Sequence, residues 1–238
     1  TEGARAFSTY VAKWLDLAKY SDDEDERNKA DALAALLTPV AKAFVSDKAL
    51  ESCVAGQQVF GGHGFIREWG QEQLVRDVRI TQIYEGTNGI QAMDLIGRKV
   101  IPNGGKYLAV LFEDMQQFID QHGSEPAMEE FISPLREAIE TTRHCAETII
   151  SQSQDDPFAA GAAANDFLHL LGLTCLAYMW LMMASAAAAK QNNDDDFYRA
   201  KIASARYFFA RQLPLIEGLR AKINSGSESV MSMQADWF

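Results

Sequence analysis

The stretch QIYEGTNGIQ, residues 82–91, has the residue types for acid–base chemistry, because it places one carboxylate where a helix should begin. Glu85 precedes Gly86, whose missing side chain would let a flat ligand come close. Asn88, with a glutamine three residues later, predicts an approximate capping box, and Thr87 is a competing cap. Backbone amides at such a helix start can hold an anionic or electron-rich group. On the residues alone, Glu85 is either a functional carboxylate or a solvated turn residue.

The other motifs give weaker signals. GGHG at 61–64 could cradle an anion with backbone amides, but its spacing favours a plain helix stop. No GxSxG elbow and no Walker A pattern occurs. None of the histidines follows a glutamate at the spacing of a di-iron bundle, and HExxH and HxxxH spacings are absent, so we expect no metal site. These histidines are His63, His122, His144 and His169.

Composition narrows the class of protein and of partner. The 238 residues carry a formal net charge of -11, which excludes nucleic acid as an expected partner because phosphate binding needs clustered Lys and Arg. Cys53, Cys145 and Cys175 are far apart and odd in number, so we expect free thiols in a reducing compartment and a cytoplasmic protein. The chain does not begin with Met and opens inside a helix pattern, so we expect a piece of a longer protein.

Helical periodicity runs through the whole chain without an alternating strand pattern, which predicts an all-α fold. Pro39 predicts a kink or a fresh helix start, and the glycines at 61–64 predict a helix end. IPNGG at 101–105 is the predicted boundary between a domain over 1–103 and a second over 104–238. The helices expected in the first domain cover 4–20, 29–60, 71–81 and 88–100, with an acidic loop after the first.

The second domain is expected to be an accessory bundle of four antiparallel helices. The connectors HGSEP, SQDDPF and NNDDDF separate them, and the last dozen residues are expected to form a loose or partner-docked tail. Residues 167–189 carry no charge and could span a bilayer, but they are rich in small residues and lack a basic N-terminal flank. We therefore expect a buried core helix there. The four expected helices cover 106–121, 126–153, 158–190 and 195–223.

Three motifs follow one another without a gap in residues 57–100: Q-x-F-G-G-x-G-F, an Arg-Asp pair and I-Y-E-G-T. This run resembles the C-terminal helical domain of acyl-CoA dehydrogenases, a bundle of four-helix type. The resemblance covers roughly residues 1–100. Residues 104–238 resemble, by helix pattern and layout, the C-terminal extension of the longer bacterial branch of that family.

The resemblance implies a specific reaction. Glu85 would remove the pro-R α-proton of an acyl-CoA thioester while the β-hydride goes to N5 of FAD, which gives a trans-2-enoyl-CoA. Electron-transfer flavoprotein would then receive the electrons, as in fatty acid β-oxidation. Gln58, Gly61 and Gly62 would touch the FAD of a neighbouring subunit in a homodimer, and Thr87 would contact the FAD of its own subunit.

Further site residues also follow from the resemblance. Tyr84 and Gly86 would bind substrate, and the backbone amide of Glu85 would bond the thioester carbonyl. Gly89 departs from the family, which has Glu or Gln there, so a side-chain contact from that position is in doubt. For the Arg-Asp pair at 76–77 we expect a structural role.

The family's fold has an N-terminal helical domain and a middle β-domain before this one, and this chain carries neither. We therefore expect no activity from the chain by itself. The alternative is a non-catalytic helical assembly or regulatory module of the same family, of which DNA-damage-response relatives are a precedent. The acidic charge suits DNA poorly, and a scaffold has no need of Glu85, so the enzyme is favoured.

Overall fold

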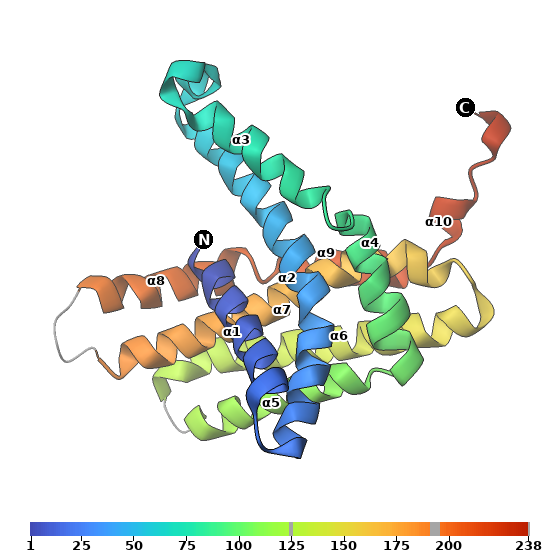
Figure 1. Cartoon of the computed structure of the whole chain (residues 1–238), viewed down its shortest axis with the longest axis horizontal. Helices are drawn as coiled ribbons and strands as arrows, with labels where there is room; N and C mark the ends of the chain where they lie inside the picture. Colours follow the sequence, from blue (N-terminus) through green and yellow to red (C-terminus); the bar gives the residue numbers. More distant parts are fainter. Residues whose placement is uncertain (124–125, 191–195, 238) are drawn as a thin grey trace.

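The structure, a computed structural model, describes residues 1–123, 126–190 and 196–237, and over these ranges it is helical without a strand (Figure 1). The all-α prediction is confirmed. The connectors around 124–125 and 191–195 lie outside the described residues.

Helices α1 (Glu2–Tyr20) and α2 (Glu24–Val59) form an antiparallel pair that carries the first part of the core. The side chain of Asp23 caps α2 by accepting the amides of Asp25 and Glu26, at 2.9 and 3.2 Å. The acidic residues expected to form a loop are therefore mostly the first turn of α2, where the helix dipole favours negative charge.

Pro39 does not divide α2, so the expected fresh start is wrong. The proline ring is buried, and α2 packs on α1 along one side and on α7 along another. A proline removes one helical hydrogen bond, but packing on both sides of it holds the helix continuous.

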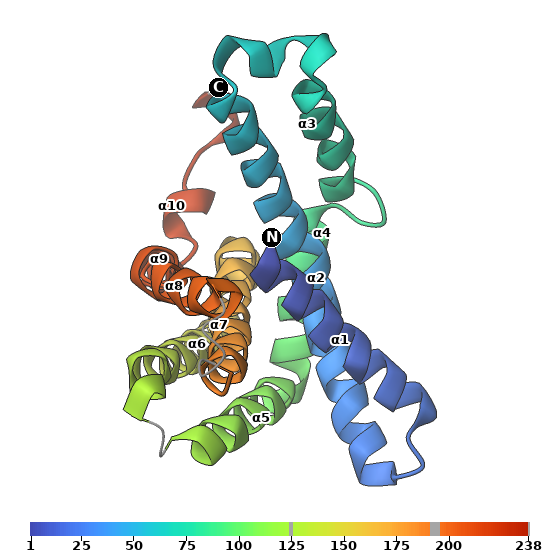
Figure 2. The same cartoon turned by 90° about the vertical axis from the view of Figure 1, so that its left-hand side faces the viewer.

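The chain turns back beyond α2, and α3 (Gln71–Arg79) lies along it as a hairpin that projects from the body (Figures 1 and 2). The predicted helix end at the glycines is confirmed, with Gly61 at φ +59°. Gly64 must be glycine, because a Cβ there would lie 2.3 Å from the carbonyl oxygen of Gln57. Short 3-10 helices cover Gly61–Phe65, Arg67–Trp69 and Ile80–Gln82.

Helix α4 (Asn88–Asp94) continues as a π-helix over Leu95–Val100 and a 3-10 turn over Ile101–Asn103. Gly104 and Gly105 then take left-handed conformations. One continuous cluster of buried side chains nevertheless joins helices on both sides of this turn. The division into domains over 1–103 and 104–238 stays a prediction.

The second half contains the expected helices with one difference. The stretch predicted as one helix over 195–223 is two, because the chain turns at Pro214, which has no amide to continue α8. The tail after α9 leaves Val230, Met231 and Trp237 exposed. The elements are α5 (Lys106–His122), a 3-10 turn (Pro126–Met128), α6 (Glu129–Asp155), α7 (Ala159–Ala188), α8 (Asp196–Arg211), α9 (Leu215–Asn224), α10 (Glu228–Met231) and a last 3-10 turn (Ala235–Trp237).

Helix α7 is the centre of the fold. It contacts α6, α8 and α9 as well as α1, α2 and α4 (Figure 2). By length and composition it is the one described helix that could cross a membrane, and 78% of its most apolar window is buried inside the protein. That burial agrees with the expected core helix.

Helix α7 packs tightly on α2 at Gly172, where an added Cβ would lie 2.5–2.8 Å from the ring of Phe44. We therefore expect Gly172→Ala to lower the free energy of unfolding by about 1–3 kcal/mol, the usual cost of overpacking a core. Chemical denaturation monitored by circular dichroism measures it. Gly161→Ala is the control on the same helix, because nothing lies within 4 Å of its Cβ position. It should be neutral or stabilising by up to about 1 kcal/mol; equal effects of the two changes would contradict the packing argument.

Candidate active site

Glu85 occupies a backbone conformation that an L-residue rarely adopts. Its φ is +53°, and it is the one non-glycine residue with positive φ in the part of the chain that the structure describes. Gly86 follows at φ +84°, and the Glu85 side chain is exposed. A left-handed conformation costs a residue with a Cβ roughly 1–2 kcal/mol. Such strain persists where surrounding contacts impose it, and it gathers at functional sites.

The loop that carries Glu85 is tied to the start of α4, but not by the predicted capping box. Thr87 is the cap residue and makes no side-chain capping bond. The side-chain amide of Gln91 donates to the carbonyl oxygen of Glu85 at 3.0 Å. The capping box fails because Asn88 turns its side chain toward α2 instead.

Two polar side chains tie this loop to α2, one from α2 itself and one from the start of α4. Lys42 donates to the carbonyl oxygen of Gly86 and to Oδ1 of Asn88, both at 2.7 Å. The Asn88 amide group lies within hydrogen-bond distance of the Ala43 carbonyl oxygen at 3.1 Å and of Ser46 Oγ at 2.9 Å. Desolvation lowers the pKa of Lys42, although the charges of Asp47 and Glu85 oppose that shift. The turn after Glu85 is therefore fixed to one face of α2.

Asp47 is the centre of the polar contacts around the loop. Its Oδ1 accepts hydrogen bonds from Gln82 at 2.5 Å and Asn88 at 2.6 Å, and its Oδ2 lies 2.9 Å from Nε2 of His169 on α7. Burial raises the pKa of Asp47, but the hydrogen bonds from His169, Gln82 and Asn88 outweigh it and leave the pKa below its ordinary range. Sequence reasoning missed this group, since His169 is 122 residues away from Asp47.

The glycine cluster lies far from Glu85. Gln58, Gly61 and Gly62 are exposed at the tip of the α2–α3 hairpin. From Lys42 to Gln58 the axis of α2 rises about 24 Å, so one subunit does not bring the two predicted groups together. No described atom lies within 4 Å of a Cβ built on either glycine. This open space over exposed backbone leaves room for a flat cofactor to approach, so these residues fit contact with FAD.

Exposed apolar side chains cover the segment between these two groups. Tyr84 is 50% exposed, Trp69 56% and Phe65 81%. Exposed apolar surface of this kind is typical of a surface that contacts another protein, a ligand or a membrane. The Arg-Asp pair makes only local contacts, Arg76 with Glu72 at 2.7 Å and Asp77 with Gln73 at 3.4 Å. The exposed apolar side chains within residues 58–85 are Val59, Phe60, Phe65, Ile66, Trp69, Leu74, Ile80, Ile83 and Tyr84, and Val54, Ile90 and Met93 flank them.

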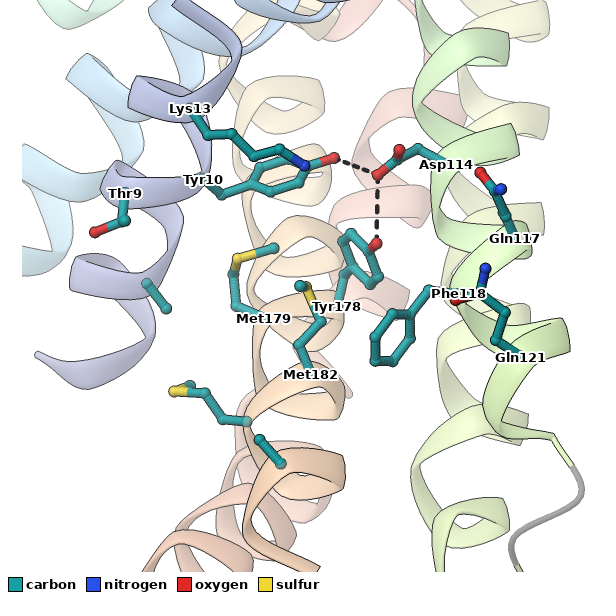
Figure 3. A pocket seen from close by; sticks show the side chains of 13 residues that line it. Thr9, Tyr10, Lys13, Asp114, Gln117, Phe118, Gln121, Tyr178, Met179 and Met182 are labelled. Carbon is teal, nitrogen blue, oxygen red and sulfur yellow. Dashed lines mark hydrogen bonds between the residues drawn. The ribbon is translucent and has the colours of Figure 1, made fainter. Parts of the chain in front are cut away.

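A cavity of about 630 Å³ lies elsewhere, between α1, α5 and α7 (Figure 3). Its polar centre is Asp114, which accepts the hydroxyls of Tyr10 at 2.7 Å and Tyr178 at 3.3 Å and pairs with Lys29 at 2.6 Å. Burial, with the charge of Asp114 as a second cause, raises the pKa of both tyrosines. The Asp114 carboxylate has its partners and the two phenols stay protonated, so none of these three groups is a free base.

The two buried thiols are not reactive groups, and the described residues contain no metal-binding cluster. Burial raises the pKa of Cys145 to about 11 and raises that of Cys175 as well, so these two act as small apolar side chains. Over the described residues, no cluster of three His, Cys, Asp or Glu side chains could hold a metal ion.

Comparison with known proteins matches both halves of the chain. Residues 15–101 match the family described as "Acyl-CoA dehydrogenase, C-terminal domain", and residues 111–234 match "Acetyl-CoA dehydrogenase C-terminal like". Among curated relatives, 3-methylmercaptopropionyl-CoA dehydrogenase of Ruegeria pomeroyi is 35% identical, and FadE5, a broad-specificity linear acyl-CoA dehydrogenase of Mycobacterium tuberculosis, is 27% identical. Each alignment covers 98% of this chain and 40% of the relative. The chain thus spans about two fifths of the length of these relatives.

Two solved structures share the fold. Caenorhabditis elegans ACDH-11 in complex with C11-CoA superposes with a TM-score of 0.72 at 18% identity, over 98% of this chain and 38% of that one. An acyl-CoA dehydrogenase of Bacillus anthracis complexed with FAD gives 0.63 at 18% identity, over 99% and 42%.

The conformation of Glu85 gives a test that needs no activity. We expect Glu85→Gly to be more stable to denaturant than Glu85→Ala by about 1 kcal/mol, because both lose the side chain but only glycine relieves the left-handed strain. The control is the ordinary helical position 161, where alanine should instead be the more stable of the two. If alanine were also the better residue at 85, the strained conformation would be refuted.

Proposed function

The chain belongs to the acyl-CoA dehydrogenase family, and we propose that it supplies the catalytic base of a flavin-dependent acyl-CoA dehydrogenase. In this proposal Glu85 takes the α-proton of an acyl-CoA thioester and the product is a trans-2-enoyl-CoA. The observation that carries the proposal is the Glu85 loop, which holds an exposed carboxylate in a strained conformation by bonds from α2 and α4.

A carboxylate of ordinary pKa, about 4.3, is a weak base for a carbon-bound proton. Burial of a carboxylate against an acyl chain removes the water that stabilises its charge and so makes it a stronger base, whereas a helix N-terminus acts in the opposite direction. Burial has the larger effect, because full burial can raise the pKa of a carboxyl group by several pH units, whereas a helix N-terminus lowers it by about one at most. The exposed position of Glu85 leaves room for a substrate to supply that burial.

In this proposal the residues beside Glu85 orient the substrate. Tyr84, half exposed beside the base, would pack on the acyl-CoA, and Gly86 would let it approach. The backbone amide of Glu85 would donate to the thioester carbonyl, which makes the α-proton more acidic. The complex of ACDH-11 with C11-CoA supports an acyl-CoA as the ligand class.

FAD is the proposed cofactor and, when bound, accepts the β-hydride. Thr87 would contact it from the subunit that supplies the base, whereas Gln58, Gly61 and Gly62 would reach it from a neighbouring subunit. The rise of about 24 Å along α2 from Lys42, which holds the Glu85 loop, to Gln58 supports this division, because one subunit cannot bring both groups to the same flavin ring. The apolar segment between them supports a homodimer. Electron-transfer flavoprotein is the proposed electron acceptor, in cytoplasmic β-oxidation.

Replacement of Glu85 tests the base. In a holoenzyme that contains this chain, Glu85→Gln should lower kcat by about 10³-fold or more, because the amide cannot take the proton. Bleaching of the flavin after mixing with acyl-CoA measures it. Glu147→Gln, at an exposed glutamate on α6 away from both groups of site residues, is the matched control and should leave kcat unchanged. Full turnover in Glu85→Gln would contradict the assignment of Glu85 as the base. A change in assembly alone would favour the alternative, a non-catalytic helical module.

The 238 residues by themselves should not oxidise an acyl-CoA. Glu85, Gly61 and Gly62 are all exposed, so none of the three lies in an enclosed site that would exclude water around the reacting atoms. Mixing the pure chain with FAD and an acyl-CoA should give neither tight flavin binding nor bleaching. Bleaching at a rate dependent on Glu85 would show that the chain needs no other segment.

A further inference from the structure

We propose that Asp47 is a positioning residue for Glu85, and that His169 on α7 holds Asp47 in that role. The proposal rests on the proposed function of Glu85. It gives the second half of the chain a part in the reaction, because α7 belongs to that half while the base does not.

Asp47 fixes the Glu85 loop at both ends. Its Oδ1 accepts from Gln82, three residues before Glu85, and from Asn88, three residues after it. The five residues between these two anchors therefore start and finish at one oxygen atom. Hydrogen bonds to an ionised acceptor are shorter and stronger than neutral ones, which suits the observed 2.5 and 2.6 Å.

The other oxygen of Asp47 connects the loop to α7. His169 Nε2 lies 2.9 Å from Oδ2, and the side chains of the pair are only 18% and 19% exposed, so water competes poorly for this bond. The His169 ring stands edge-on to Phe44, with centroids 5.6 Å apart, which fixes its orientation. Without His169, the Asp47 carboxylate would be free to turn away from Gln82 and Asn88.

The alternative is that these bonds only stabilise the fold. A purely structural role would change stability and leave the chemistry of folded enzyme as it was. A positioning role makes proton abstraction itself slower, because a base displaced by about 1 Å can cost about 10²-fold in rate. Stability and the rate of the chemical step therefore separate the two.

The test uses a holoenzyme that contains this chain and a straight-chain acyl-CoA with hydrogen or deuterium at the α-carbon. Asp47→Asn and His169→Leu should each lower the flavin reduction rate by about 10- to 100-fold with KM changed less than threefold. The α-deuterium isotope effect on reduction should rise, since proton removal becomes more limiting. His169→Gln should recover most of the rate, because its side-chain amide can donate to Asp47 as Nε2 does.

The matched control is Asp166→Asn, less than one turn before His169 on α7. It removes a carboxylate that pairs with Lys222 at 3.3 Å and has no contact with the loop, and the rate should not change. If Asp47→Asn does not fold, Gln82→Met removes one of the two loop anchors alone and should shift the rate and the isotope effect in the same direction.

The outcomes separate the two proposals. If Glu85→Gln is inactive while Asp47→Asn, Gln82→Met and His169→Leu keep the wild-type rate and isotope effect, the positioning role is wrong and the base stands. If Glu85→Gln is active, the proposed function fails. In that case faster amide hydrogen exchange over 82–91 in Asp47→Asn, with no change over α6, would still show that Asp47 holds the loop, and unchanged exchange would refute it.

Discussion

The close contact between α7 and α2 is the constraint on which the rest of the structure depends. Gly172 faces Phe44 with no space for a side chain, and one turn away on each helix His169 faces Asp47. The Gly172–Phe44 contact sets the distance between the two helices. His169 and Asp47 can form their hydrogen bond at 2.9 Å only because that distance is short. An apolar packing contact thus decides where a polar one can exist, and the polar contact continues into the Glu85 loop.

The helices followed from the sequence where local signals act alone. Apolar periodicity predicted most helices to within a few residues, and the glycines at 61–64 and 101–105 predicted the breaks, because glycine alone takes those backbone angles without strain. The failures share one cause. The fresh helix start expected at Pro39 does not occur and Asn88 turns away from its capping position, since contacts with distant segments outweigh the local preference.

The candidate site divides in the same way. A short motif was enough to single out Glu85, because its neighbours in the chain are its neighbours in the loop. Lys42, Asp47 and His169 carry no motif, and their relation to Glu85 exists only after α2 and α7 have packed. The sequence gives only a weak signal, since Lys42 and Asp47 are two polar residues, five positions apart, that interrupt the apolar pattern of α2.

The two groups of predicted site residues therefore differ in how the chain supports them. The Glu85 loop is held from α2, α4 and α7, so its geometry is set by contacts between both halves of the chain. Gln58 and the two glycines lie at the tip of a hairpin with open space above them. A base must be placed accurately relative to one proton, whereas backbone that contacts a cofactor can be fixed when the cofactor and a second surface close over it. Under the proposed function, the chain fixes in advance the group whose position would control the rate.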